Sequence, residues 1–337
     1  MRILISSHLF APSVGGIEQV TAILAEEFAA MGQTVGVVTT TLAAPTGEPP
    51  PPYAIHRQPD AWQLWRLVRR CDVFFQSNVS VAMLWPALLQ RKPTVVACHV
   101  WITQPDGRLG ARERFKRFAL RLVSRNVAVS RAVAASLPVP CTVMPNPYRE
   151  NIFFVDTSVA RDRDVVFLGR LVSDKGADVV IEALRLLRLR GVEPGLTVIG
   201  DGPEAPALRR QAAEAGLSAQ VRFIGTRTGS ELRRELNRHR IMVVPSRWAE
   251  PFGVVALEGA ACGCFVIGAN GGGLPEAIGP CGELFPSGDS GALASALQRR
   301  LNDPSPPTTP PIAAHLARHR RRAVAERYLE IFRAAIR

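Results

Sequence analysis

Strand-length apolar runs alternate with helical segments along almost the whole chain. The first such unit is the run RILISS at 2–7, a helical pattern over 17–31, and the run TVGVVTT at 34–40. Apolar residues that recur every three or four positions predict an amphipathic helix, whereas a short apolar run indicates a buried strand. A strand–helix–strand unit requires parallel strands, which are buried on both faces. This order therefore predicts an α/β fold with parallel sheets.

The alternation resumes after a polar, irregular stretch at 149–163, which we interpret as a linker. Further strands are expected at 165–169, 196–200, 221–225, 241–246 and 264–269, each followed by a helix. A chain of 337 residues is long enough for two domains. We predict two doubly wound Rossmann-like domains at 1–150 and 151–311, with a terminal helix over 312–337. Ligands in such sheets bind at the carboxyl ends of the strands.

The formal net charge of +12 is unevenly distributed. Residues 1–150 hold 16 basic and 9 acidic residues, residues 151–314 hold 18 of each, and residues 315–337 hold 7 and 2. The basic residues gather at 108–125 and 318–337, without the motifs of nucleic-acid readers, so we expect no nucleic-acid partner. An anionic membrane or a phosphorylated lipid acceptor suits these segments better. For the helix expected at 110–125, a solvated polar face over a packed apolar stripe is an equal alternative.

The cysteines and histidines show no metal-binding spacing. The six cysteines form no C-x-x-C pair and favour burial as free thiols. The DRD sequence at 162–164 precedes a strand rather than following one, so we interpret it as surface charge. We therefore expect no metal and no other cofactor. The apolar runs are too short to cross a bilayer, and the first residues are too polar for a signal peptide. These features predict a cytoplasmic protein.

Two carboxylates in the segment VVPSRWAEPFGVVALEGAACGCFVIGANGGGLPE, residues 243–276, indicate a binding site. Glu250 precedes a turn at Pro251–Phe252–Gly253, in which glycine lets backbone amides approach an anion. A helix is expected at 254–261, and its first amides favour negative charge. Glu258, about one turn into that helix, can accept hydrogen bonds from a diol such as ribose. A ligand in which a polyol, a diphosphate and a ribose follow one another is a nucleotide sugar, so this pattern predicts a nucleotide-sugar site.

The sequence SRWAEPFGVVALEGAACG, followed by GGLPE, resembles the signature of the retaining glycosyltransferases of family 4, which have the GT-B fold. The resemblance is strong at 164–286, good at 1–40 and weak at about 42–150. It implies two doubly wound domains that face a central cleft, with the terminal helix crossing back to the first domain. It further implies that the C-terminal domain binds the nucleotide sugar and that the N-terminal domain binds the acceptor.

Four residues are expected to meet the donor diphosphate. Gly15 and Gly16 precede the first helix, in a loop that lacks both the Walker A lysine and the full dinucleotide fingerprint. A tight turn explains these glycines equally well, but the resemblance implies diphosphate contact. Arg170 and Lys175 follow a strand. The planar guanidinium of arginine and the mobile ammonium of lysine together suit a diphosphate. An ordinary solvated loop is the alternative, and the resemblance implies that both residues stabilise the departing diphosphate.

The remaining candidates surround the sugar and the base. His99 ends a strand, and the resemblance implies contact with the donor sugar, although a lone histidine is more often structural. Gly200 lies either in the donor pocket or in a simple turn that starts a helix. The resemblance implies that Thr226 and Arg227 contact the base, and that Glu250 with the amides of Phe252, Gly253 and Val254 orients the sugar. Asn146-Pro147 departs from the Asn-Gly of the family and leaves the role of Asn146 open.

The sequence thus predicts a retaining, metal-independent hexosyltransferase. It would move a sugar from a nucleoside-diphosphate sugar to a glycan or glycolipid acceptor, in cell-surface polysaccharide or lipopolysaccharide biosynthesis at the inner face of the cytoplasmic membrane. One alternative is a nucleotide-sugar epimerase of the same fold, although no acid and base pair for it is evident in the first domain. The other is a non-catalytic nucleotide-sugar-binding subunit, against which the joint presence of Arg170, Lys175, Glu250 and Glu258 argues.

Overall fold

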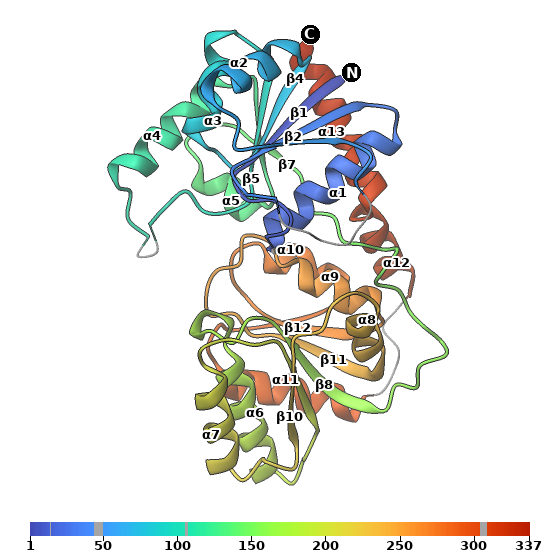
Figure 1. Cartoon of the computed structure of the whole chain (residues 1–337). Helices are drawn as coiled ribbons and strands as arrows, with labels where there is room; N and C mark the ends of the chain where they lie inside the picture. The colour runs from blue at the N-terminus through green and yellow to red at the C-terminus, as the bar shows by residue number, and fades with distance from the viewer. Residues whose placement is uncertain (14, 44–49, 105–106, 304–308) are drawn as a thin grey trace. The chain divides into compact units, whose positions relative to one another are not determined.

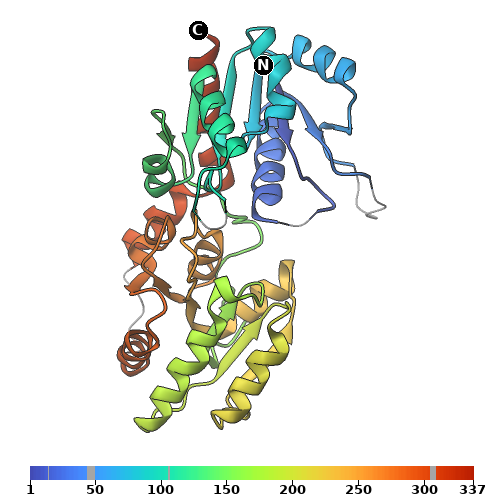
Figure 2. The ribbon, with the colours of Figure 1, turned by 90° about the vertical axis from the view of Figure 1, so that its left-hand side faces the viewer.

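The computed structural model of the chain describes residues 1–13, 15–43, 50–104, 107–303 and 309–337. The chain divides into two compact units, one comprising Met1–Pro147 with His319–Arg337 and the other Tyr148–Arg318. Figures 1 and 2 show the C-terminal segment, in red, beside the blue and green elements of the first unit. The sequence places a boundary at 150, and the observed division follows Pro147.

The first unit contains a seven-stranded sheet in the order β3-β2-β1-β4-β5-β6-β7. Its strands are β1 (Arg2–Ser7), β2 (Thr34–Thr39), β3 (Ala54–Arg57), β4 (Val73–Ser77), β5 (Thr94–Cys98), β6 (Arg125–Ala128) and β7 (Thr142–Val143). All of the neighbouring strands pair in parallel. The strand order reverses between β1 and β4, and a crevice for ligands forms at such a switch point.

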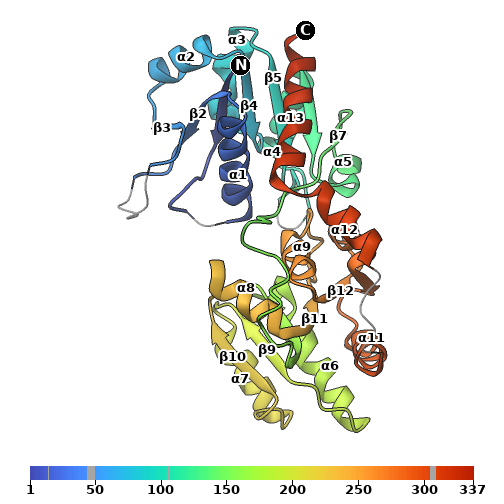
Figure 3. The ribbon, with the colours of Figure 1, turned by 90° about the vertical axis from the view of Figure 1, so that its right-hand side faces the viewer.

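Helices cover both faces of this sheet. On one face, α1 (Gly16–Ala30) packs against α13 (Arg321–Ile336), as Figure 3 also shows. Their shared core includes Phe28, Phe75 and Phe332. On the other face, α2 (Ala61–Arg70) packs against α3 (Val81–Leu89), and α4 (Ala111–Ala119) and α5 (Arg131–Ser136) complete the unit. Both faces are therefore covered, as a parallel sheet requires.

The prediction of one helix over 312–337 is wrong, because the segment forms two helices. The first, α12 (Thr309–Arg318), belongs to the second unit, where the His315 Nε2 atom lies 2.9 Å from the carbonyl oxygen of Ala277. The second is α13, which belongs to the first unit. Arg320 separates the two helices because its backbone is extended, with φ −66° and ψ 147°.

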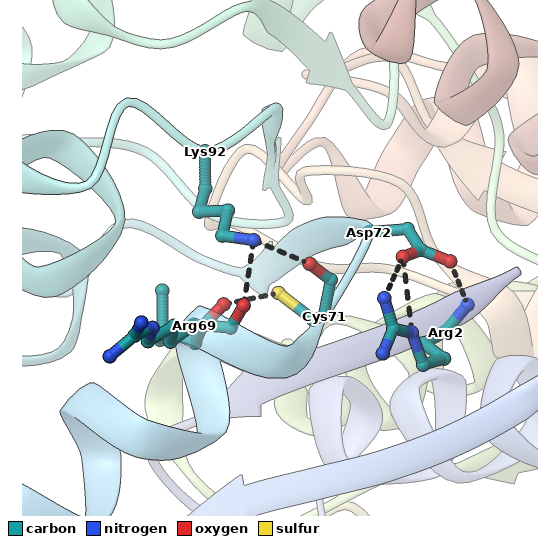
Figure 4. Close-up of polar contacts among 6 residues, drawn as sticks. Arg2, Arg69, Cys71, Asp72 and Lys92 are labelled. Atoms are coloured by element: carbon teal, nitrogen blue, oxygen red, sulfur yellow. Dashed lines mark hydrogen bonds and ion pairs between the residues drawn. The ribbon is translucent and has the colours of Figure 1, made fainter.

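Polar contacts stabilise the amino-terminal edge of the first sheet (Figure 4). The Arg2 guanidinium donates to Asp72 Oδ1 at 2.7 Å and lowers the pKa of that carboxyl. The Lys92 ammonium donates to the carbonyl oxygens of Arg69 at 2.8 Å and Cys71 at 2.9 Å, where α2 ends. A cation at this place satisfies carbonyl groups that have no partner inside the helix.

The second unit contains a six-stranded parallel sheet in the order β10-β9-β8-β11-β12-β13. Its strands are β8 (Arg163–Leu168), β9 (Leu196–Ile199), β10 (Val221–Gly225), β11 (His239–Val244), β12 (Phe265–Ala269) and β13 (Gly282–Phe285). Its helices include α6 (Ala177–Leu189), α7 (Ala205–Glu214), α8 (Gly229–Arg238), α9 (Val254–Ala261), α10 (Leu274–Ile278) and α11 (Ser290–Asn302). The helix α6 packs against α7 and α11, whereas α9 packs against α10, β11 and β12. The predicted parallel α/β architecture is thus confirmed in each unit.

All six cysteines are free, and five of them are buried. Burial raises the pKa of the Cys71 thiol to about 11 and that of the Cys98 thiol to about 12, which makes them inert at neutral pH. The predicted structural burial is therefore confirmed for these five residues. In the part of the chain that the structure describes, no helix has the length and apolar character needed to cross a bilayer.

Replacement of Phe332 by alanine tests the contribution of α13 to the first unit. The ring is fully buried, with its centroid 5.4 Å from that of Phe28 and 5.2 Å from that of Phe75. We expect Phe332→Ala to lower the free energy of unfolding by about 3–5 kcal/mol because it leaves a cavity. Chemical denaturation followed by circular dichroism measures this change. Ile336→Ala on the same helix, at a position that is 43% exposed, is the control, and equal losses would contradict the assignment of α13 to the core.

Candidate functional site

The loops at the carboxyl ends of β8, β9 and β11 pack closely because glycines permit it. A Cβ atom on Gly200, whose φ is +137°, would lie 1.9 Å from the carbonyl oxygen of Gly169. A Cβ atom on Gly176, whose φ is +69°, would lie 2.3 Å from the carbonyl oxygen of Pro245. Any larger residue would force these loops apart, so the glycines hold the candidate residues at one edge of the sheet.

Lys175 and Glu250 meet at this edge. The Lys175 Nζ atom donates to Glu250 Oε1 at 2.5 Å, and the Ser246 hydroxyl donates to the same oxygen at 2.7 Å. The Lys175 side chain is 33% exposed and that of Glu250 is 14% exposed. Both bonds end on Oε1, so Oε2 keeps its capacity to accept hydrogen bonds from a ligand. The structure thus brings together two of the predicted site residues and adds Ser246, which the sequence prediction missed.

The start of α9 lies directly after Glu250. Gly253 precedes the helix with φ +102°, and a Cβ atom there would lie 2.7 Å from Leu274 Cδ1. Phe252 is buried and anchors the turn. No side chain caps the helix, and the first amides of a helix have no partner within it. The amides at Val254 therefore suit an anion, and the helix expected at 254–261 is confirmed.

Burial raises the pKa of the Glu258 carboxyl to about 8, and the positive charge of Arg149 offsets part of that shift. The carboxyl is thus largely protonated at neutral pH without a ligand. Hydrogen bonds donated by hydroxyl groups of a ligand would favour the ionised form and lower the pKa again. The sequence prediction missed Arg149, because its position in the linker gives no indication of a charge beside Glu258.

Three predicted donor contacts do not join this cluster. Arg170 is exposed in the loop after β8. Thr226 is exposed after β10, and the Arg227 guanidinium donates to the carbonyl oxygen of Thr226 at 2.9 Å. The Arg227 side chain also lies 4.0 Å from the Glu231 carboxylate. Their roles in binding phosphate and base stay predictions.

An acidic side chain lies at the start of α1 in the first unit. Gly15 precedes the helix with an extended backbone, and a Cβ atom there would lie 2.3 Å from Glu18 Oε2. A Cβ atom on Gly16 would have no neighbouring heavy atom within 4 Å. Val14 lies outside the described residues. A carboxylate thus already faces the helix start at which the sequence predicts a diphosphate.

His99 is buried after β5 and is held by two asparagines. Its backbone amide donates to Asn78 Oδ1 at 2.7 Å, and its Nδ1 atom lies 3.1 Å from Asn146 Oδ1. Because an amide oxygen can only accept, Nδ1 carries the proton and Nε2 keeps its lone pair. The Nε2 atom is buried and has no hydrogen-bond partner among the described residues. Burial lowers the pKa of the imidazole to about 4, so the ring is neutral at neutral pH. Asn146, whose role the sequence left open, orients this ring.

Within the described ranges, no group of three or more histidine, cysteine, aspartate or glutamate side chains is placed to hold a metal ion. Asp162 of the DRD sequence pairs with Arg238 at 2.7 Å on the surface. The Asp164 carboxylate accepts a hydrogen bond from the Gly195 amide at 3.0 Å. The interpretation as surface charge is confirmed for Asp162, which is exposed, whereas Arg163 and Asp164 are half-buried residues of β8.

Two family models match successive parts of the chain. The model "Glycosyltransferase Family 4" matches residues 14–147, and the model "Glycosyl transferases group 1" matches residues 148–318. The chain belongs to the group 1 glycosyltransferase family. The matches nearly coincide with the two units, so the Lys175–Glu250 cluster lies in the group 1 part and His99 in the family 4 part.

Curated relatives match the group 1 glycosyltransferase over part of their length. Glycogen synthase from Mycobacterium tuberculosis is 38% identical over 146 residues, which are 42% of this chain and 34% of that protein. A GDP-mannose-dependent alpha-(1-6)-phosphatidylinositol monomannoside mannosyltransferase from Mycolicibacterium smegmatis is 34% identical over 42% of this chain and 39% of that protein. A D-inositol 3-phosphate glycosyltransferase from Mycolicibacterium paratuberculosis is 34% identical over 52% and 41%. The matched segments thus span about a third to two fifths of these relatives.

Solved structures match over nearly the whole chain. Anabaena Alr3699/HepE in complex with UDP and glucose has a TM-score of 0.78 at 20% identity, covering 98% of this chain and 99% of that one. Sucrose-phosphate synthase from Thermosynechococcus elongatus has a TM-score of 0.77 at 21% identity, covering 99% and 98%. At this identity the likeness shows the fold, and the predicted GT-B fold is confirmed.

Replacement of Glu258 by glutamine tests its raised pKa. A carboxyl whose pKa is higher in the folded than in the unfolded state contributes stability below its ordinary pKa of 4.5 and loses it as the pH rises to about 8. We expect Glu258→Gln to raise the free energy of unfolding at pH 8 by roughly 2–4 kcal/mol and to change it little at pH 4.5. Urea denaturation at both pH values measures the difference. The exposed Glu214→Gln is the control, and an equal effect at both pH values would exclude the raised pKa.

Proposed function

We propose that this group 1 glycosyltransferase moves a hexose from a nucleoside-diphosphate sugar to a hydroxyl of a glycan or glycolipid, with retention at the anomeric carbon and without a metal ion. The observation that carries the proposal is the cluster of Lys175, Glu250 and Ser246 beside the open start of α9. The names of two similar proteins support it, since one is a GDP-mannose-dependent mannosyltransferase and the other was crystallised with UDP and glucose.

The diphosphate is proposed to bind Lys175, Arg170 and the first amides of α9. Before the donor binds, the Lys175 ammonium is paired with the Glu250 carboxylate. A diphosphate carries more charge than one carboxylate and can compete for the ammonium. The Glu250 carboxylate can then accept hydrogen bonds from the sugar hydroxyls, while Glu258 accepts hydrogen bonds from the ribose hydroxyls. Positive charge aimed at the leaving diphosphate contributes several kcal/mol to the transition state.

The other proposed donor contacts belong to the first unit. For His99, Gly15 and Gly16 these roles stay predictions. During transfer the bond between the anomeric carbon and the diphosphate oxygen breaks, and the acceptor oxygen bonds on the same face. The acceptor proton passes to the departing diphosphate. Cell-surface polysaccharide or lipopolysaccharide assembly in the cytoplasm is the proposed context.

Replacement of Lys175 by alanine tests the proposed leaving-group role. A thermal-shift panel of UDP-, GDP- and ADP-sugars first identifies the donor, because a bound ligand stabilises the fold by mass action. We expect Lys175→Ala to lower kcat for donor hydrolysis or transfer about 10²–10³-fold, since it removes charge from the leaving group. Arg210→Ala, at an exposed position in the same unit, is the matched control. If none of the sugar nucleotides stabilises the protein, the proposal is contradicted. An epimerised donor that forms in the absence of any acceptor would indicate an epimerase.

Helix α4 supports the proposed contact with an anionic membrane. Phe115 is 56% exposed, Phe118 is 51% exposed and Leu122, just after the helix, is 53% exposed. The alternative of a packed apolar stripe is therefore wrong for these residues. Arg114 and Arg121 are exposed beside them, and cations around an exposed apolar stripe are typical of helices that lie on anionic bilayers.

The second basic segment, 318–337, is less suited to a membrane. The apolar residues Tyr328 and Phe332 of α13 are buried in the core of the first unit. The Arg321 guanidinium lies 3.3 Å from the Glu27 carboxylate. With the apolar face covered and one cation paired, we assign membrane contact to 108–125 and a structural role to α13.

The double variant Phe118→Ser/Leu122→Ser tests this contact, and it leaves in place Phe115, which also lines a cavity of the first unit. We expect its binding to phosphatidylglycerol vesicles to fall at least about tenfold, because each of the two apolar side chains contributes about 1.5–3 kcal/mol when it leaves water. Co-sedimentation measures binding, with phosphatidylcholine vesicles as the neutral comparison. Leu189→Ser, which removes a residue that is 74% exposed in the other unit, is the control. Undiminished binding of the double variant would refute the role of α4.

A further inference from the structure

A cavity of about 650 Å³ lies within the first unit, at the switch point between β1 and β4. Residues from the ends of both strands and from the starts of α1 and α3 line it together with one side of α4. Its polar lining includes Ser7, His8, Glu18, Asn78, Arg112 and Lys116. The volume is in the range of small-molecule sites, which combine apolar walls with a few polar groups.

Two cations of α4 line this cavity and have no ion-pair partner among the described residues. Arg112 and Lys116 lie four residues apart, hence on one side of the helix, and both contribute to the cavity wall. Neither forms a side-chain hydrogen bond or ion pair with the residues that the structure describes. Arg117, by contrast, donates to the carbonyl oxygen of Ser136 at 2.7 Å. Two like charges at this spacing repel each other, and an anion bound between them would offset that repulsion.

Another part of the lining has the reverse charge. Glu18 at the start of α1 lines the cavity, as do Ser7 and His8 at the end of β1. Glu113 lies beside Lys116 along a smaller cavity of about 60 Å³. The large cavity is thus polarised, with cations at α4 and a carboxylate at α1. A ligand that carries an anionic group at one end and hydroxyl groups at the other would fit this polarity.

We infer that the cavity binds an acceptor that carries a phosphate, with the phosphate between Arg112 and Lys116 and the hydroxyl groups at Glu18 and His8. A guanidinium fork beside a second cation suits the several oxygens of a phosphate group. This orientation places the acceptor hydroxyl groups at the start of α1 and the end of β1. The inference rests on the proposed function and names the acceptor class. The phosphate belongs either to a soluble ester or to a lipid.

Calorimetric titration of the whole chain with glycerol 3-phosphate and with glycerol tests the inference. All titrations use an Arg170→Gln/Lys175→Gln background, which removes the proposed donor-phosphate cations, so that a failure of donor binding cannot affect the result. We expect glycerol 3-phosphate to bind much more tightly than glycerol. Arg112→Gln/Lys116→Gln should weaken that binding at least about tenfold, because two charge-assisted contacts are lost.

The matched control is Arg114→Gln/Arg121→Gln, which removes two cations of the same segment that do not line the cavity. We expect it to leave glycerol 3-phosphate binding unchanged. Equal weakening by both double variants, or equal binding of glycerol and glycerol 3-phosphate, would overturn the inference. Circular dichroism verifies that each variant is folded.

A water-soluble dibutyryl phosphatidic acid distinguishes the two sources of phosphate. Tighter binding of this lipid than of glycerol 3-phosphate assigns the site to a lipid phosphate, whereas equal binding assigns it to a soluble ester. In both cases the inference requires that Arg112→Gln/Lys116→Gln weaken the interaction. If Arg112→Gln/Lys116→Gln binds the lipid as tightly as the unmodified cavity does, the phosphate lies elsewhere and the inference is overturned.

Discussion

The bond between Lys175 and Glu250 joins two loops that lie 75 residues apart in the chain. It forms only because glycines allow the loops to touch, as the contact between Gly176 and the carbonyl oxygen of Pro245 shows. The pair holds a cation and an anion at the carboxyl edge of a parallel sheet, where both can face a ligand. Each charge offsets the other, and the Ser246 hydroxyl donates a further hydrogen bond to Glu250. A diphosphate that replaced the carboxylate at Lys175 would leave this hydrogen bond in place.

The half-buried Glu258 and the buried His99 are both mainly neutral at neutral pH without a ligand, for the same physical reason. Burial raises the pKa of the Glu258 carboxyl to about 8 and lowers that of the His99 imidazole to about 4. In both groups the charged form loses its hydration. The consequences for a ligand differ. Hydroxyl groups of a ribose would favour ionisation of Glu258, whereas His99 stays a neutral acceptor whose proton is fixed on Nδ1 by Asn146.

Local patterns predicted most of the fold, and long-range contacts account for what they missed. Hydrophobic periodicity gave the strands and helices, and the strand–helix–strand order then required parallel sheets. The start of α9 was predictable because Gly253 and the helix that follows it are adjacent in sequence. The charge effect of Arg149 on Glu258 and the hydrogen bond of His99 with Asn146 join distant residues, so no local pattern indicates them. The helix break at Arg320 was missed because the arginine-rich sequence around it contains neither proline nor glycine.

The basic residues of α4 lie on two different faces of the helix. The basic excess of the chain lies outside residues 151–314, and α4 divides part of it between two faces. Arg112 and Lys116 line the cavity, whereas Arg114 and Arg121 flank the exposed Phe118. Successive turns of a helix repeat every 3.6 residues, so a short segment can present one set of cations inward and another outward. An acceptor phosphate and an anionic surface would thus be met by the same nine-residue helix and the turn that follows it, which links acceptor binding to the place where a lipid-borne acceptor resides.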